Sequence, residues 1–175
     1  MKNLQKDIEK ILDLFNSKDY SNTVLSCKKL ISSNPTVVYL YNILGLALMN
    51  QKKTDEAIFW YKEGISKEPK FAMIYNNLAS AYKSLNNLNK AEEYYNKSIS
   101  LNNNIPEPFN NLGNLLRLNN KYNDAVTNFK KAIKINEKFF WSYYNLGITY
   151  TSLGKFNDAI SSIEHTIRLN PNFCP

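Results

Sequence analysis

The dipeptide Leu-Gly, or its near-equivalent Leu-Ala, recurs every 34 residues along most of this chain. Each copy has an aromatic residue three positions before the Leu, an Ala thirteen positions after it and a large apolar residue four positions beyond that Ala. The four copies are Leu44-Gly45, Leu78-Ala79, Leu112-Gly113 and Leu146-Gly147. Self-similarity at a fixed period of this size indicates a stacked array in which each repeat is one supersecondary unit.

Each repeat contains the patterns of two helices. With position 1 set at Val38, Ala72, Pro106 and Phe140, the four repeats align without a gap. Apolar residues at positions 4, 7, 8 and 11 predict an amphipathic first helix. A polar turn follows, and apolar positions 20, 21, 24 and 28 predict a second helix, which must end before the prolines at position 32. Glycine at position 8 predicts a close approach of the two helices, and Gly154 in a turn predicts a positive φ.

The domain prediction covers residues 1–175 as a single domain. Residues 38–71, 72–105, 106–139 and 140–173 are four good repeats, and residues 4–37 are a degenerate copy in the same register. Terminal repeats are commonly atypical because one side of them faces solvent. We therefore interpret residues 4–37 as an N-terminal repeat or cap.

This pattern resembles the tetratricopeptide repeat, a helix-turn-helix unit of 34 residues. The segment PEPFNNLGNLLRLNNKYNDAVTNFKKAIKIN, which begins at Pro106, is the best copy. The resemblance implies an all-α, right-handed superhelical solenoid of antiparallel helix pairs. It also implies that the first helices line a concave groove that holds an extended peptide or a partner helix.

Positions 2, 5, 6, 9, 12 and 13 of the first helix lie opposite its packing stripe and are expected to face this groove. An amide can both donate and accept a hydrogen bond, so asparagines at position 6 could bind a peptide backbone of any sequence. Such a series looks like the asparagine ladder of O-linked N-acetylglucosamine transferases, although Ile43 interrupts it. Asparagine is also common throughout the chain, which is the competing explanation. The predicted peptide-binding residues are Asn77, Lys83, Asn110, Asn111, Asn114, Arg117, Trp141, Tyr144 and Asn145.

The net charge of +7 raises the question of acidic or nucleic-acid partners. The lysines are dispersed, and many fall on the second helices, which indicates a solvated outer face. Lys83 and Arg117 share position 12 and could pair with acidic groups of a ligand, or could be ordinary surface charge. RNA binding through the basic surface is a lesser alternative, and a nucleic-acid partner is not the expected one.

Enzymatic activity, metal sites and cofactors are not predicted. The chain has one histidine, His165, without a partner at ligand spacing, and lacks the G-x-G-x-x-G and G-K-[ST] strings of nucleotide sites. Its two cysteines, at positions 27 and 174, form no metal or redox spacing, and Cys27 is expected to be a buried small residue. The N-terminus does not resemble a signal peptide, and no apolar run approaches the roughly 18 residues of a membrane span. These features predict a cytoplasmic protein without a membrane partner.

The predicted function is a protein-interaction scaffold that binds an extended, acidic peptide or a partner helix in its groove. The alternative is a substrate-recognition arm of a larger glycosyl- or sulfotransferase-like enzyme, cut near residue 175. Repeat arrays generally need a polar closing helix, and none is expected after residue 169. An apolar edge formed by Ile160, Ile163, Ile167 and Leu169 would then favour a further domain or self-association.

Overall fold

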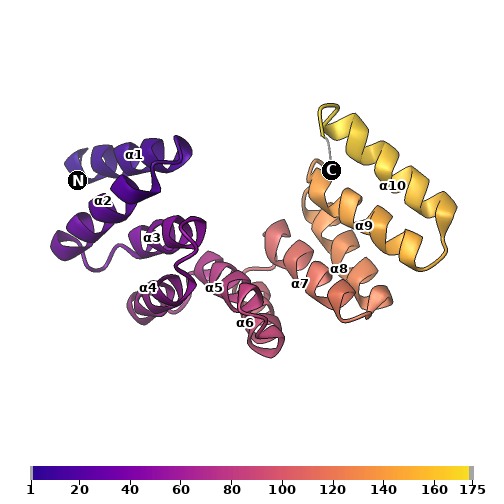
Figure 1. Ribbon diagram of the computed structural model, residues 1–175, viewed down its shortest axis with the longest axis horizontal. Coiled ribbons are helices and arrows are strands. Elements are labelled where there is room, and N and C mark those ends of the chain that lie inside the picture. The colour runs from indigo at the N-terminus through magenta and orange to yellow at the C-terminus, as the bar shows by residue number, and fades with distance from the viewer. Residues whose placement is uncertain (1, 174–175) are drawn as a thin grey trace. The chain divides into compact units, whose positions relative to one another are not determined.

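The computed structural model describes the backbone of residues 2–173 and the side chains of residues 4–173. These residues form ten α-helices and no strand, connected by short turns (Figure 1). Two helices fall in each 34-residue repeat, which confirms the all-α fold built from helix pairs. The helices are α1 (Lys2–Asn16), α2 (Tyr20–Ser33), α3 (Val38–Asn50), α4 (Thr54–Lys67), α5 (Ala72–Ser84), α6 (Leu88–Leu101), α7 (Pro106–Leu118), α8 (Tyr122–Ile135), α9 (Phe140–Ser152) and α10 (Phe156–Leu169).

The chain divides into two compact units, and the boundary lies within α6. Unit 1 is Met1–Tyr94 and unit 2 is Tyr95–Pro175. In unit 1, α3 packs against α4 of its own repeat, α2 of the preceding repeat and the first helices α1 and α5. In unit 2, α9 has the equivalent neighbours α10, α8 and α7. Each of these central first helices is thus held on three sides by other helices.

Glycine at position 8 permits the close contact inside a helix pair. A Cβ atom built on Gly45 would lie 2.2 Å from Cε1 of Tyr61, and one on Gly113 would lie 2.6 Å from Cε1 of Phe129. Both rings have no exposed surface. The prediction of a close approach at position 8 is confirmed, and its cause is a large ring at position 24 that occupies the space of the missing side chain.

The turn between the two helices of each repeat places position 15 in the left-handed region. The residues there have φ angles between 58° and 70°, and they are Lys18, Lys52, Asn86, Asn120 and Gly154. In each turn the next backbone N–H donates to the carbonyl at position 11, at 2.9 Å. This is the Schellman pattern of helix ends, in which a residue with positive φ lets the last carbonyls find donors. The positive φ expected for Gly154 is confirmed, and the same geometry occurs with Lys or Asn in the other turns.

The aromatic residue at position 4 links a repeat to the preceding one. In unit 1, the hydroxyls of Tyr41 and Tyr75 donate to the carbonyl oxygens of Pro35 and Pro69, each at 3.0 Å. The ring of Trp60 lies 6.0 Å from that of Tyr41, and the ammonium of Lys28 lies 5.8 Å from its centroid. Because Lys28 belongs to the preceding repeat, the Trp60 side chain packs under that repeat. Desolvation of the two tyrosine hydroxyls raises the pKa of Tyr41 and Tyr75.

Cys27 occupies position 24 of the first repeat and has no exposed surface, as expected. Burial raises the pKa of its thiol to about 12. Because the thiolate is the reactive form, Cys27 is chemically inert at neutral pH. Cys174 lies outside the described residues.

The outward face of α10 carries large apolar side chains that remain in contact with solvent. Phe156, Ile160 and Ile167 are 63%, 58% and 53% exposed, and Leu169 is 37% exposed. At the positions of Ile160 and Ile167 in α2, Val24 and Ile31 are only 9% and 7% exposed. The apolar edge expected from the sequence is present at Ile160, Ile167 and Leu169. Ile163 was wrongly included, because its side chain packs against Gly147 inside the helix pair.

Candidate functional site

The candidate site lies on the inner face of the first helices, defined as the side that carries positions 2, 5, 6, 9, 12 and 13. Position 2 is open to solvent: Tyr39, Met73 and Trp141 are 38%, 42% and 45% exposed. Position 5 differs from the expectation. Asn42 and Asn110 are 2% and 7% exposed, because each lies in the seam between its own helix and the next first helix, α5 for Asn42 and α9 for Asn110.

Asparagines of this seam bind one another in unit 1. The side-chain amide of Asn77 on α5 donates to the Oδ1 atom of Asn42 on α3 at 2.8 Å. Asn42 is only 2% exposed, so its carbonyl needs a partner within the protein. The pair joins position 6 of one repeat to position 5 of the repeat before it.

Unit 2 repeats this arrangement with different residues. The amide of Asn145 on α9 donates to the Oδ1 atom of Asn110 on α7 at 3.0 Å. The hydroxyl of Ser142 donates to the same oxygen at 3.2 Å. Asn110 and Asn145 are 7% and 8% exposed, so most of their surface is used inside the protein rather than offered to a ligand.

This pairing also explains why Ile43 interrupts the asparagine series. Ile43 stands at position 6 and is 2% exposed, and the residue at position 5 of the preceding repeat is Ile8. The helices that carry them, α1 and α3, pack against each other. Where position 6 is apolar (Ile43), position 5 of the preceding repeat is apolar as well (Ile8). An amide at only one of the two positions would lack its hydrogen-bond partner.

Replacing Asn77 with isoleucine is expected to lower the free energy of unfolding by about 2 kcal/mol, because the buried carbonyl of Asn42 loses its donor. The double variant Asn42→Ile/Asn77→Ile should recover most of this loss, since it reproduces the Ile8 and Ile43 combination. Urea denaturation of both single variants and the double variant measures the coupling. Asn50→Leu, at an exposed position, is the control. Strictly additive single effects would contradict the amide pair.

Position 9 and position 12 carry the polar groups of α7 that have no partner. The Oδ1 atom of Asn114 and the Nε atom of Arg117 are both buried and lack a hydrogen-bond partner among the described residues. The two residues are three apart, so they lie on the same side of the helix. One atom accepts and the other donates, which matches the two hydrogen-bonding groups of a peptide unit.

Unit 2 also carries an aromatic cluster at the start of α9. The rings of Trp141 and Tyr144 on α9 lie 5.3 and 4.9 Å from that of Phe173, and Phe140 lies 4.7 Å from Trp141. The sequence prediction included Trp141 and Tyr144 but not Phe140 or Phe173. Aromatic residues at position 34 of three repeats, Phe71, Phe139 and Phe173, were the available signal.

The predicted site residues therefore fall into two separate groups. Asn77 and Lys83 belong to unit 1, whereas the other seven belong to unit 2. Within unit 2, α7 and α9 pack against each other and bring Asn110, Asn111, Asn114 and Arg117 to the same face as Trp141, Tyr144 and Asn145. Asn111 is half-buried and already takes part in an interaction inside the protein.

His165 makes contacts within its own helix pair. Its ring stacks on Tyr143 with centroids 5.2 Å apart, and its Nδ1 atom lies 2.9 Å from the carbonyl oxygen of Ser161. Among residues 4–173, no group of three or more His, Cys, Asp or Glu side chains could hold a metal ion. No helix in the described part of the chain has both the length and the apolar character to cross a membrane.

An array of helix pairs with an open inner face belongs to the class of repeat scaffolds for protein interaction. Models of the tetratricopeptide repeat match residues 38–71, 72–105, 94–127 and 140–173, and a further TPR repeat model matches residues 113–154. The chain belongs to the tetratricopeptide repeat family.

Solved structures share this fold at low sequence identity. PilW, described as a widely conserved type IV pilus biogenesis factor, has a TM-score of 0.87 at 16% identity, covering 99% of this chain and 80% of that one. TTC0263, a thermophilic TPR protein in Thermus thermophilus, has a TM-score of 0.84 at 16% identity, covering 97% and 92%. YrrB, described as a TPR protein with an unusual peptide-binding site, has a TM-score of 0.67 at 16% identity, covering 95% and 86%. The curated proteins contain no match to this sequence.

Proposed function

We propose that this chain is an interaction scaffold whose unit 2 binds an extended, acidic peptide across α7 and α9. The observation that carries the proposal is the pair of unpartnered atoms, Asn114 Oδ1 and Arg117 Nε, on the inner face. A buried polar atom without a partner costs about 1–3 kcal/mol. Because neither atom contacts solvent, the side chains of Asn114 and Arg117 would have to turn outward to meet a peptide unit, and pairing with it would relieve this cost.

The neighbouring side chains define what else the peptide would contain. Arg117 has further guanidinium donors besides Nε, and these favour a carboxylate. Trp141 is 45% exposed, and rigid aromatic rings are common anchors at interfaces. The favoured ligand is therefore an extended segment with an acidic residue over α7 and an apolar residue against Trp141 and Tyr144. The printed description of YrrB, which names a peptide-binding site, supports peptide binding within this fold.

A peptide array that varies acidic and apolar residues tests this proposal, followed by titration of the best peptide. Arg117→Ala is expected to weaken binding about tenfold to a hundredfold, because it removes a charge-assisted hydrogen bond. Asn114→Ala should weaken binding about fivefold to tenfold for every peptide sequence, since it contacts the backbone. Arg168→Ala, which removes an exposed cation from α10, is the matched control. Unchanged affinity in both α7 variants would refute the site.

A second proposal concerns the exposed apolar face of α10. Ile160 and Ile167 are on one side of the helix, and Asp158 and Arg168 lie in its first and last turns. Two copies of α10 packed antiparallel would place the acidic first turn of each beside the basic last turn of the other. Sedimentation equilibrium should then show dimers that Ile160→Glu dissociates. A wild-type protein that stays monomeric at about 100 μM, a concentration above the Kd of typical specific complexes, would exclude this dimer.

A further inference from the structure

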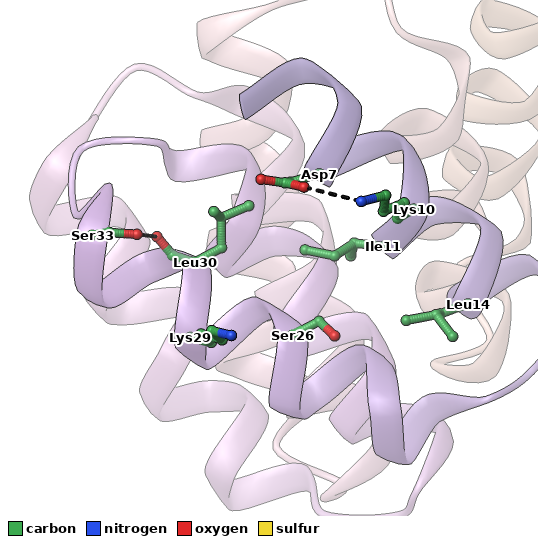
Figure 2. Close-up of a pocket in the computed structure, with 8 residues that line it drawn as sticks. All are labelled: Asp7, Lys10, Ile11, Leu14, Ser26, Lys29, Leu30 and Ser33. Atoms are coloured by element: carbon green, nitrogen blue, oxygen red, sulfur yellow. Dashed lines mark hydrogen bonds and ion pairs between the residues drawn. The ribbon is translucent and has the colours of Figure 1, made fainter. Parts of the chain in front are cut away.

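The first helix pair encloses a cleft of about 350 Å³ between α1 and α2 (Figure 2). Asp7, Lys10, Ile11 and Leu14 line it from α1, and Ser26, Lys29 and Leu30 are among the residues that line it from α2. Cavities that hold small organic molecules begin at about 300 Å³. The cleft belongs to unit 1, so it is separate from the peptide site proposed on unit 2.

Two of the other four repeats carry two aromatic rings in the equivalent space, whereas the repeats that contain Phe109 and Tyr143 have Asn128 and Ser162 at position 23. In the repeats that contain Tyr41 and Tyr75, the rings at positions 4 and 23 fill this space: Tyr41 with Trp60 at 6.0 Å and Tyr75 with Tyr94 at 6.3 Å. The first repeat has Asp7 and Ser26 at these two positions. Two small polar residues therefore replace two aromatic rings, and the volume of those rings is left free.

The walls of the cleft combine apolar surface with positive charge. Ile11 is buried, and Leu14 and Leu30 are half-buried around the opening (Figure 2). The ammonium of Lys10 lies 3.5 Å from the carboxylate of Asp7, so the charges of this pair offset each other. Lys29 has no ion pair among the described residues and is exposed. The cleft thus presents an apolar interior with one unpaired cation at its rim.

We propose that this cleft is a binding site for a small aromatic anion. The aromatic ring occupies the volume equivalent to that filled by aromatic side chains in the repeats of Tyr41 and Tyr75, against Ile11, Leu14 and Leu30. The anionic group, a carboxylate or a similar oxyanion, pairs with Lys29. A ligand without the ring would leave the apolar interior wet, and a ligand without the charge would leave Lys29 unpaired.

Indole-3-acetate is a suitable probe, because indole and acetate provide its two halves as controls. We expect an NMR titration of the full chain to give saturable amide shifts at Ile11, Ser26, Lys29 and Leu30. Indole-3-acetate should bind at least about fivefold more tightly than either half, as expected when a charge-assisted hydrogen bond adds to apolar burial. Equal affinity for indole would overturn the role assigned to the anion, and shifts outside α1 and α2 would overturn the site.

Two variants and a matched control test the residues. Lys29→Gln should weaken binding of indole-3-acetate about tenfold and leave binding of indole unchanged. Ser26→Trp restores the ring found at Trp60 and should abolish binding of both compounds, while thermal unfolding verifies that it folds. Lys28→Gln removes the neighbouring cation, which lies over Trp60 outside the cleft, and should have no effect. Affinity unchanged in Lys29→Gln would overturn the proposal whether or not Ser26→Trp folds.

Discussion

Gly45→Val is expected to lower the free energy of unfolding by at least about 3 kcal/mol, the upper end of the cost of overpacking a core. The new Cβ would lie 2.2 Å from Cε1 of Tyr61, whose ring has no exposed surface. Replacing a helical glycine normally gains up to about 1 kcal/mol of helix propensity. The steric cost exceeds that gain, so the substitution lowers the free energy of unfolding.

Urea denaturation followed by circular dichroism measures this effect. Gly154→Asn is the control, because nothing lies within 4 Å of a Cβ at Gly154 and Asn already adopts the same positive φ at positions 86 and 120. It should change stability by less than about 0.5 kcal/mol, as most surface substitutions do. Combining Gly45→Val with Tyr61→Ala should cost less than the sum of the two single effects, because the valine side chain occupies part of the space of the ring. The chain itself contains such an exchange, with Ile11 at position 8 and Cys27 at position 24. A stable Gly45→Val protein would contradict the packing of α3 on α4.

Alkaline pH is expected to destabilise the protein through its buried thiol and phenols. Burial raises the pKa of Cys27 from 9.0 to about 12. The thiol ionises in the unfolded chain near pH 9, whereas in the folded chain it stays protonated up to about pH 12. Unfolding therefore releases a proton in this interval, and stability is lost as pH rises. Each pH unit removes about 1.4 kcal/mol, or about 4 kcal/mol by pH 12.

Tyr61 acts in the same direction at higher pH. Its hydroxyl is buried without a hydrogen-bond partner, and desolvation raises its pKa above the ordinary value of 10.0. The contribution of Tyr61 to stability is complete below pH 10. It is lost as pH rises above 10, because the tyrosine ionises in the unfolded chain before it does so in the folded chain. The pH dependence of urea denaturation, in reducing buffer between pH 8 and about pH 11.5, separates the groups. Cys27→Ala should flatten the decline that begins near pH 9, and parallel curves for Cys27→Ala and wild type would contradict the burial of the thiol.

The repeat pattern was sufficient to predict the helices, because each 34-residue unit shows the apolar period of two helices and a turn between them. The need for a glycine at position 113, for example, follows from the sequence, because each glycine at position 8 is followed sixteen residues later by a large apolar residue, here Phe129. The asparagines were different. A helical wheel places positions 5 and 6 opposite the packing stripe, but it describes one helix and omits the neighbouring first helix that covers Asn42 and Asn110.

The candidate site was thus only partly visible in the sequence. Trp141 is exposed at position 2, as a groove residue would be, whereas the Nε atom of Arg117 is buried, and a role of either residue in binding stays a prediction. Phe173 was missed, since it belongs to no helix and reaches Trp141 and Tyr144 only after the chain returns from α10. The cleft at Asp7 and Ser26 was also missed, although Asp7 departs from the aromatic residues at position 4 of the other four repeats.

The fold class, the register of the helices and the family follow from sequence alone, because the helical apolar period and its recurrence every 34 residues are both visible without knowledge of packing. The use of each polar side chain depends on packing between repeats. Asn77 and Asn114 are chemically identical amides on first helices, yet one hydrogen-bonds the preceding helix and the other has an unpartnered oxygen on the inner face. What separates them is the neighbouring helix, which lies 34 residues away in sequence and in direct contact in space.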